Sequence, residues 1–319
     1  MSAPGTVLVT GAAGFIGSTL TDRLLAEGRR VVGLDSFDPF YPEDQKLRNL
    51  EKAEASGAFR LLRGDIRNGA DLDRALASEP IGAIVHLAAL AGVRPSLERP
   101  GDYSDVNVLG STRVFDAAVR AGVPHVVFAS SSSVYGERSE GPFRESDSVE
   151  RPISPYAATK RAGELVAHTF HHIHGLSVTC ARIFTAFGPR QRPDLAIRKF
   201  ADLILAGEPI PVFGDGSAVR DFTFVDDLVG GLVAALDRPL GFALLNFGAG
   251  RTISVNEVIA QLESSLGVRA RVEHLPRQPG DVTRTWADIT RARADLGYDP
   301  TTSFEEGVAR FTAWLRERA

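Results

Sequence analysis

A glycine-rich turn near the start of the chain limits the folds open to this sequence more than any other feature. The β-branched run Thr6–Thr10 predicts a short strand, and residues 15–27 carry apolar residues at helical spacing. Between them stand Gly11, Gly14 and Gly17. In this order, the first glycine permits a tight turn, the second lets a pyrophosphate approach the backbone, and the third lets the helix pack closely on the strand. The turn therefore predicts a dinucleotide site, although three such glycines can also arise by chance among 31.

Strand-like and helix-like runs alternate through the first half of the chain. Further strands are expected at residues 30–35, 59–64, 81–88 and 125–130, with helices at 71–77 and 105–121 between them. Such alternation indicates a parallel sheet with helices on both faces. We therefore predict an α/β fold, a Rossmann-type doubly wound parallel sheet, followed by a smaller C-terminal α/β substrate domain.

The second half of the chain is less regular. Its expected elements are a helix at 155–174, a strand at 176–183, a helix at 196–206 and a Gly/Pro-rich stretch at 209–221. Ser254 with Glu257, and Ser303 with Glu306, have the spacing of helix capping boxes. We assign residues 1–183 to the dinucleotide-binding domain, with 218–250 returning to it, and residues 184–319 mainly to the substrate domain.

An acidic residue at the end of the second strand indicates which dinucleotide is bound. Asp35 stands about 20 residues after the glycine turn, where an acid binds the ribose hydroxyls. Its carboxylate would repel a 2′-phosphate, so we expect NAD rather than NADP; a turn or helix-capping aspartate is the alternative. The other residues expected to contact NAD are Phe15, Ile16, Asp65, Ile66, Leu87, Ala88, Ala89 and Asn107.

Tyr156 and Lys160 form the strongest catalytic candidate. Their i, i+4 spacing puts both side chains on one face of a helix. A phenol has a pKa of about 10, and an ammonium group ~4 Å away would lower it by roughly three units. The pair thus predicts a base suited to removing a proton from a hydroxyl group. A serine run, Ser130–Ser133, follows the preceding strand and offers a hydroxyl to the reacting oxygen.

Composition excludes several classes of partner. The net charge is −4, which lacks the basic footprint of a nucleic-acid-binding protein, and no apolar run reaches the roughly 20 residues of a membrane span. Cys180 is the only cysteine, so no disulfide framework can form. We expect a soluble cytoplasmic protein. We also expect no metal, because the histidines at 168, 171, 172 and 174 lie at a helix end and lack a recurring ligand spacing.

With these residues in view, the chain resembles the extended short-chain dehydrogenase/reductases, and among them the nucleotide-sugar epimerases of the UDP-glucuronate 4-epimerase subgroup. The resemblance covers nearly the whole chain, from VTGAAGFIG at 9–17 through RDFTFVDD at 220–227 to QPGD at 278–281. It implies that Ser131 joins Tyr156 and Lys160 in the catalytic set. It also implies a homodimer formed through the helices at 105–121 and 155–174.

Three places separate the subgroups of this family. Ser132 and Ser133 stand where the dehydratases carry an Asp-Glu pair and the decarboxylases a glutamate. Thr185 stands where the UDP-galactose epimerases carry asparagine. The stretches 92–97 and 188–194 match the UDP-glucuronate 4-epimerases, with departures at Gln191 and at 186–187.

The resemblance implies NAD-dependent epimerisation at C4, from UDP-glucuronate to UDP-galacturonate. Tyr156 would take the C4 hydroxyl proton while NAD accepts the hydride, which then returns to the other face of a 4-keto intermediate. The alternatives are a UDP-glucose 4-epimerase, a UDP-glucuronate decarboxylase, and a non-catalytic NAD-binding sensor.

The 4-keto uronate is a β-keto acid that loses carbon dioxide when its carboxylate bond stands perpendicular to the carbonyl plane. We expect Ser131, Ser132, Ser133 and Thr185 to hold the carboxylate in another orientation, with Arg192 as countercharge. For Arg192, a phosphate contact or a solvated loop position is the alternative. The resemblance assigns the UDP moiety to Lys199, Phe213, Arg220 and Asp281, with Arg94 as a phosphate contact. For Arg220 a surface salt bridge is the alternative, and for Lys199 and Arg94 a structural role is equally open.

Overall fold

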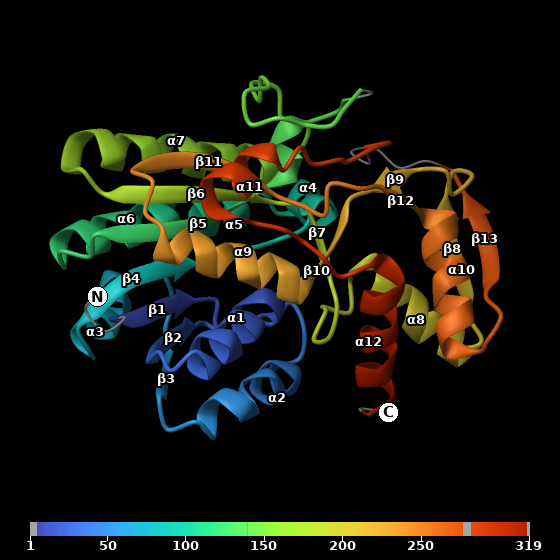
Figure 1. Cartoon of the computed structure of the whole chain (residues 1–319), viewed down its shortest axis with the longest axis horizontal. Coiled ribbons are helices and arrows are strands. Elements are labelled where there is room, and N and C mark those ends of the chain that lie inside the picture. The colour runs from blue at the N-terminus through green and yellow to red at the C-terminus, as the bar shows by residue number, and fades with distance from the viewer. Residues whose placement is uncertain (1–4, 139, 277–281, 318–319) are drawn as a thin grey trace.

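Seven parallel strands form the central sheet, in a computed structural model that describes residues 5–138, 140–276 and 282–317. Their order across the sheet is β11-β6-β5-β4-β1-β2-β3 (Figure 1). The strands are β1 (Thr6–Thr10), β2 (Val31–Asp35), β3 (Phe59–Arg63), β4 (Ile81–His86), β5 (His125–Ser131), β6 (Ser177–Ile183) and β11 (Phe242–Phe247). Every neighbouring pair is parallel, which confirms the predicted doubly wound sheet.

Helices cover both faces of this sheet (Figure 1). One group consists of α1 (Phe15–Ala26), α2 (Glu43–Glu54), α9 (Val225–Asp237) and α11 (Thr290–Leu296). The other consists of α3 (Gly69–Ala77), α4 (Val93–Glu98), α5 (Pro100–Ser104), the π-helical turn η1 (Asp105–Gly110), α6 (Ser111–Arg120) and α7 (Pro155–His174). The strands are buried on both sides by two apolar clusters, one under each helix layer, as expected for a parallel sheet.

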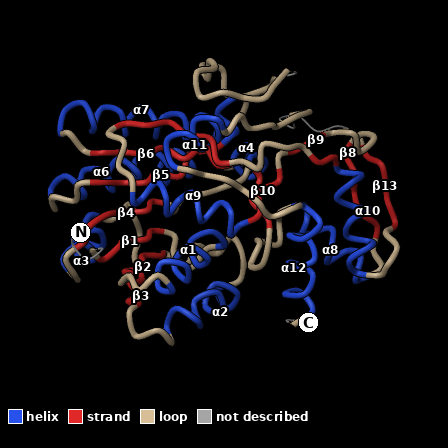
Figure 2. The backbone as a smooth tube through the Cα atoms, in the orientation of Figure 1, coloured by secondary structure: helices blue, strands red, loops and turns tan. Residues whose placement is uncertain are grey.

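A second, smaller core lies beyond the carboxyl ends of the strands. It is built from α8 (Ala196–Ala206), α10 (Val255–Leu266), α12 (Phe304–Arg316) and the parallel pair β8 (Pro209–Phe213) and β13 (Arg271–Leu275) (Figure 2). Two short sheets link it to the main body: β7 (Thr185–Phe187) with β10 (Phe222–Phe224), and β9 (Val219–Arg220) with β12 (Ile253–Ser254). The predicted capping box of Ser254 and Glu257 is present at the start of α10.

Some elements differ from the sequence expectation. The stretch 209–221 was expected to be irregular but contains β8 and β9, because β8 finds its partner in β13, far along the chain. The helix expected at 105–121 is divided into η1 and α6. No helix among the described residues is long and apolar enough to cross a bilayer.

The strand order fixes where a ligand can bind. The chain runs from β1 to β2 and β3 on one side and to β4, β5, β6 and β11 on the other. The helices that leave β1 and β4 therefore lie on opposite faces and open a crevice at the carboxyl ends of these strands, which is where ligands bind in open α/β sheets.

Candidate active site

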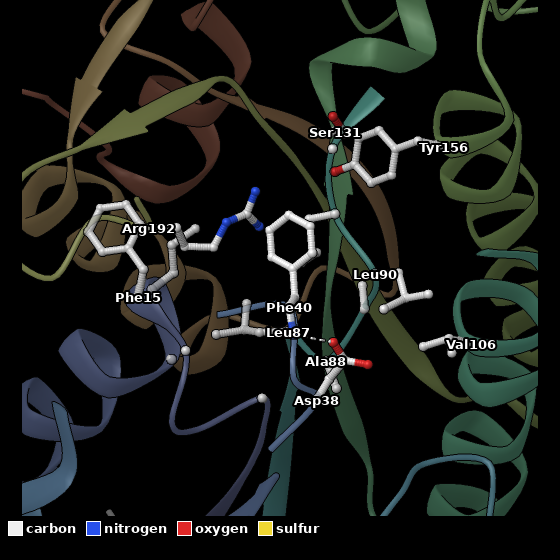
Figure 3. Close-up of a pocket in the computed structure, with 18 of the residues that line it drawn as sticks. Phe15, Asp38, Phe40, Leu87, Ala88, Leu90, Val106, Ser131, Tyr156 and Arg192 are labelled. Carbon is white, nitrogen blue, oxygen red and sulfur yellow. Dashed lines mark hydrogen bonds between the residues drawn. The ribbon is translucent and has the colours of Figure 1, made fainter. Parts of the chain in front are cut away.

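A cavity of about 510 Å³ occupies this crevice. Its walls come from the turn after β1, the ends of β2 to β5, the start of α7 and the segment 183–195 (Figure 3). The predicted residues that line it are Gly11, Gly14, Phe15, Ile16, Gly17, Asp35, Asp65, Ile66, Leu87, Ala88, Ala89, Ser131, Ser132, Ser133, Tyr156, Lys160, Thr185 and Arg192. The structure thus gathers the residues expected to contact a dinucleotide and those expected to act on a sugar around one cavity.

Glycine is required twice in the turn after β1. Gly11 has φ +73°, and a Cβ atom there would lie 2.8 Å from the Ala88 nitrogen. A Cβ on Gly17 would lie 2.0 Å from the Gly11 carbonyl oxygen, so any side chain would push α1 away from β1. The close approach leaves the N-terminus of α1 open toward the cavity, where its N–H groups suit a pyrophosphate.

Asp35 is tied into this turn by its carboxylate. One oxygen accepts from the Ala13 N–H at 2.9 Å and the other from the Phe37 N–H at 2.8 Å. A carboxylate has further lone pairs, and Asp35 lines the cavity, so the geometry leaves it able to accept ribose hydroxyls as well. The other backbone group of Ala13 is also held, because Asn49 of α2 donates to its carbonyl at 3.1 Å.

Several residues of the cavity were missed in the sequence. The loop after β2 contributes Asp38, Phe40 and Tyr41, and α2 contributes Lys46. In the sequence, these residues are marked only by two adjacent aromatic residues, Phe40 and Tyr41, that follow Asp35. The spacing of apolar residues, which predicts helices and strands, does not identify such a pair as part of a site. Tyr103 of α5 was missed too; its ring packs edge-on against that of Tyr156, with 6.2 Å between centroids.

The residues that begin helix α7 determine how Tyr156 and Lys160 face the cavity. Ser154 caps it by accepting from the Ala157 N–H at 3.1 Å, and Pro155 occupies the first helical position. Lys160 Nζ donates to the carbonyl of Ala129 at 2.8 Å. The Ser131 side chain lies opposite the Tyr156 hydroxyl, and Figure 3 shows the two side chains facing each other at the end of β5.

The protein environment shifts both ionisable groups of the pair. Burial raises the pKa of Tyr156, while the hydrogen bond with Ser131 and the positive charge of Arg192 act in the opposite direction. Burial outweighs these two effects, so the pKa of Tyr156 is raised, and the predicted lowering by Lys160 does not appear among the effects of the protein's own groups. Burial also lowers the pKa of Lys160, to about 8.

Arg192 reaches the cavity from the far side. Its guanidinium forms two hydrogen bonds with Asp194, at 2.9 and 2.8 Å, and lies 5.3 Å from the centre of the Phe40 ring. Figure 3 shows it extending toward that ring. The cation therefore faces the space between the loop after β2 and Tyr156.

Five predicted site residues do not line this cavity: Asn107, Arg94, Lys199, Phe213 and Arg220. Asn107 instead holds the loop that does, because its side chain accepts from the Leu90 N–H at 2.8 Å and donates to the Leu90 carbonyl at 2.9 Å.

The residues assigned to UDP lie in the second core or face it. The Arg94 guanidinium lies 4.6 Å from the centre of the Phe213 ring, so α4 and β8 meet there. Arg220 donates to the Val282 carbonyl at 2.6 Å, and Lys199 belongs to α8. Asp281 lies outside the described residues. The assignment of these residues to UDP stays a prediction.

The fold and this site together define a short-chain dehydrogenase/reductase of the extended type: a Rossmann sheet, a Ser-Tyr-Lys set at the end of β5 and a second core beyond the strand ends. The profile of the GDP-mannose 4,6 dehydratase family matches residues 8–311. The chain belongs to this family, and the resemblance seen in the sequence is confirmed.

Several relatives within the family are similar over nearly their full length. A UDP-glucuronate 4-epimerase of Thermodesulfobacterium geofontis is 42% identical over 314 residues, which cover 98% of this chain and 97% of that protein. The crystal structure of the UDP-glucuronic acid 4-epimerase of Bacillus cereus, in complex with UDP-glucuronic acid and NAD, has a TM-score of 0.93 at 36% identity and covers 98% of this chain and 100% of its own. The structure of MoeE5 in complex with UDP-glucose and NAD has a TM-score of 0.89 at 41% identity, and covers 98% of this chain and 99% of its own.

Proposed function

We propose that this protein is an NAD-dependent isomerase that converts UDP-glucuronate to UDP-galacturonate by epimerisation at C4. The observation that carries the proposal is the cavity that joins the glycine turn to the Tyr156–Ser131 pair, with serines at 132 and 133 instead of acidic residues. Full-length similarity to UDP-glucuronate 4-epimerases supports the choice of sugar.

The cavity fits NAD, because the close packing at Gly11 and Gly17 leaves the N-terminus of α1 open toward it, and Asp35 stands at the position that binds a ribose. When bound, NAD supplies a hydride acceptor that later returns the hydride. Tyr156 removes the proton from the C4 hydroxyl and gives it back. Ser131 holds the reacting oxygen against Tyr156, and Lys160, anchored on Ala129, brings positive charge close to the site.

The residues around the sugar decide what becomes of the 4-keto intermediate. Ser132, Ser133 and Thr185 line the same cavity and offer hydroxyls to the sugar carboxylate, while Arg192 offers countercharge. Neutral hydroxyls fix the direction of the carboxylate without removing it fully from water. This arrangement favours return of the hydride over loss of carbon dioxide.

Incubation of the purified protein with UDP-glucuronate, followed by NMR of the product sugar, tests the proposal. We expect UDP-galacturonate at equilibrium with substrate and no net consumption of NAD. UDP-glucose is tested in parallel, because MoeE5 binds both this sugar and UDP-glucuronic acid in solved structures. Turnover of UDP-glucose alone would replace the proposal with a UDP-glucose 4-epimerase, and no turnover of either sugar would favour an NAD-binding sensor.

Thr185→Val and Arg192→Ala test the assignment of the carboxylate contacts. Each removes one group that holds the carboxylate, and a lost hydrogen bond of ~1 kcal/mol changes a product ratio about fivefold. We expect both variants to release more UDP-pentose and carbon dioxide per epimerisation. Thr179→Val is the matched control, because the buried Thr179 hydroxyl has no hydrogen-bond partner in the described part of the chain. Unchanged epimerisation without UDP-pentose in the two site variants would contradict the assignment.

We further propose a cytoplasmic homodimer formed through α6 and α7, and UDP binding by Arg94, Lys199, Phe213, Arg220 and Asp281. The two helices pack against each other on one face of the sheet. Exposed apolar side chains on α7, such as Leu165 and Ile173, are available to a second copy. The Arg94 guanidinium lies 4.6 Å from the centre of the Phe213 ring, which supports a shared role for these two residues.

A further inference from the structure

Three successive residues at the end of β5 each meet a residue of α7. Ala129 and Ser130 are hydrogen-bonded to Lys160 and Glu164, and Ser131 faces Tyr156. The three helix residues are four positions apart and so share one face. Two of these attachments belong to the catalytic set described above, whereas the third, in which Ser130 Oγ donates to Glu164 at 2.6 Å, has no role in it.

Glu164 is a buried anion held by two arginines. Arg182 of β6 donates to both of its carboxylate oxygens, at 2.8 and 2.9 Å, and Arg161 donates at 3.0 Å. The side chains of Glu164 and Arg182 are 0% and 1% exposed. A buried ion pair is rarely more stabilising than apolar residues of the same volume, because both charges lose their hydration. Stability alone therefore does not explain a charged pair at this place.

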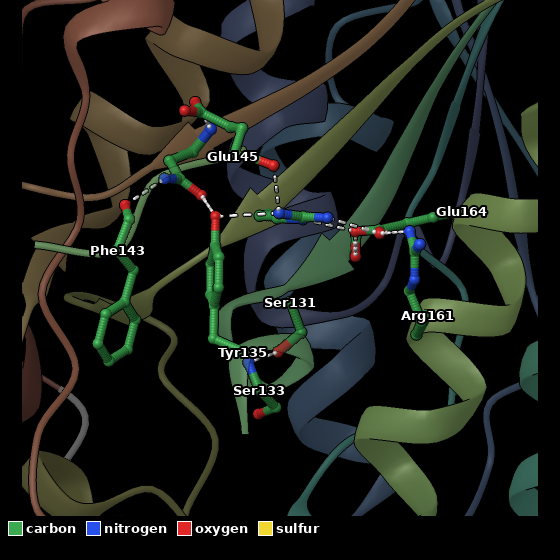
Figure 4. A network of polar contacts seen from close by, with 10 residues as sticks. Ser131, Ser133, Tyr135, Phe143, Glu145, Arg161 and Glu164 are labelled. Atoms are coloured by element: carbon green, nitrogen blue, oxygen red, sulfur yellow. Dashed lines mark hydrogen bonds and ion pairs between the residues drawn. The ribbon is translucent and has the colours of Figure 1, made fainter. Parts of the chain in front are cut away.

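The same arginine also holds the other end of the serine turn. The turn η2 (Ser132–Tyr135) follows directly on Ser131 and ends at Tyr135. The Tyr135 hydroxyl accepts from Arg182 at 3.1 Å and donates to the Asn246 side chain in β11 at 2.7 Å. Figure 4 shows these bonds following one another across the core, from Glu164 toward Tyr135 and Glu145.

We propose that Glu164 and Arg182 are positioning residues that fix the serine turn, and thereby decide whether the 4-keto intermediate is reduced or loses carbon dioxide. This inference rests on the proposed function. The pair anchors the turn before Ser131 through Ser130 and after Ser133 through Tyr135. Ser131, Ser132 and Ser133 therefore keep their orientation toward the sugar even though η2 is only one short turn of helix.

The competing reaction needs no oxidant or reductant. Once the hydride has been removed from C4, the C5–C6 bond can break and release carbon dioxide. Its electron pair then forms an enolate across C4 and C5, which takes a proton from water at C5 and gives a 4-keto pentose. The rate of this step depends on the angle between the carboxylate bond and the carbonyl plane, so a serine turn that moves by a small amount changes the ratio of the two products.

Tyr135→Phe and Ser130→Ala test the inference with the holoenzyme. Each removes one hydroxyl that ties the turn to the buried pair, and neither leaves a charge unpaired. The matched controls are Tyr298→Phe and Ser177→Ala, which remove hydroxyls bonded to the Gly248 and Gly241 carbonyls, away from the serine turn. The readout is the ratio of labelled carbon dioxide to UDP-galacturonate from UDP-glucuronate labelled at C6, together with the KM for UDP-glucuronate.

We expect the ratio to rise about fivefold or more in both test variants, with KM little changed, and to stay at the wild-type value in both controls. A fall in kcat at an unchanged ratio would show a merely structural role and overturn the inference, as would equal ratios in test and control variants. If Tyr135→Phe fails to fold, Ser130→Ala decides by the same ratio. Wild-type enzyme that makes no UDP-galacturonate would instead overturn the proposed function.

Discussion

Lys160 is an amine that the fold removes almost completely from water. Its Nζ donates to a backbone carbonyl, and no carboxylate is hydrogen-bonded to it in the described part of the chain. Burial of an ammonium group without an anionic partner is unfavourable, which is why its pKa falls to about 8. Chains that need such a group for catalysis retain it at a cost in folding stability.

Lys160→Met is expected to show this cost through its pH dependence. The folded-state pKa of about 8 lies below the ordinary value of 10.5, so the unfolded chain binds more protons between these two pH values. The contribution of Lys160 to folding stability therefore rises as the pH rises through this window, by about 3 kcal/mol in all. Relative to wild type, the variant should lose about that much stability between pH 7 and pH 10.5, and it should lose epimerase activity at every pH.

Denaturant unfolding of both proteins at several pH values measures the difference. Lys52→Met is the control, because Lys52 is exposed on α2. A stability difference between Lys160→Met and wild type that stays constant from pH 7 to pH 10.5 would contradict the buried-amine explanation.

Two departures from the subgroup pattern contact each other. Gln191 is almost fully buried, and its side-chain amide donates to the Ala186 carbonyl at 3.2 Å. Phe187, next along the chain, packs among Phe222, Phe224 and Phe304. Gln191 and Phe187 thus belong to the packing behind Thr185, whereas Ala186 lines the cavity.

At the scale of elements, α9 shows how position decides the effect of a glycine. It carries two adjacent glycines, Gly230 and Gly231, on a helix that packs against β5, β6 and α1. A Cβ on Gly230 would meet nothing within 4 Å, whereas a Cβ on Gly231 would lie 2.6 Å from the Phe247 ring.

The substitutions Gly230→Ala and Gly231→Ala should therefore have opposite effects on stability. Alanine favours a helix by ~1 kcal/mol over glycine, so Gly230→Ala is expected to stabilise the protein by up to that amount. Gly231→Ala must displace the ring of Phe247 in β11 and is expected to destabilise it by ~1–3 kcal/mol. Thermal unfolding of the pair measures both, and a shift of the same sign in the two variants would show that α9 does not pack as described.

Elements with a strong local signal were predicted well, and those that depend on distant partners were not. The spans of α7 and α8 were predicted residue for residue, because Ser154, Pro155 and the C-terminal glycines at 175 and 207 mark their ends. The strand β8 was missed since it carries two prolines and is stabilised by pairing with β13. The helix α2 was missed since its mostly polar residues give little apolar periodicity.

At the scale of the whole molecule, one exposed leucine on α7 and one on α8 allow the proposed dimer interface to be compared with surface outside it. Leu165 on α7 is 53% exposed and Leu205 on α8 is 48% exposed. Only the first belongs to the helices proposed to form the homodimer. We therefore expect Leu165→Arg to convert a dimer to a monomer in sedimentation velocity, because it places a charge in an apolar contact.

Leu205→Arg is the matched control and should leave the dimer intact. If wild-type protein sediments as a monomer, or if Leu165→Arg stays dimeric, the proposed interface is contradicted. The pocket-lining residues belong to the same chain in the described structure, so the monomeric variant should keep most of its NAD affinity.

The sequence by itself determined the local chemistry of this protein. The glycine turn, the acid at the end of β2 and the Tyr-Lys spacing each depend on residues close together in the chain, where backbone geometry and helical periodicity follow directly from residue type. Only the tertiary structure decided what these groups meet. Three contacts join segments that are separated along the chain: Ser131 with Tyr156, Lys160 with Ala129, and Arg182 with Glu164. The pKa values of Tyr156 and Lys160 and the ion pair of Glu164 depend on burial, which no local sequence pattern predicts.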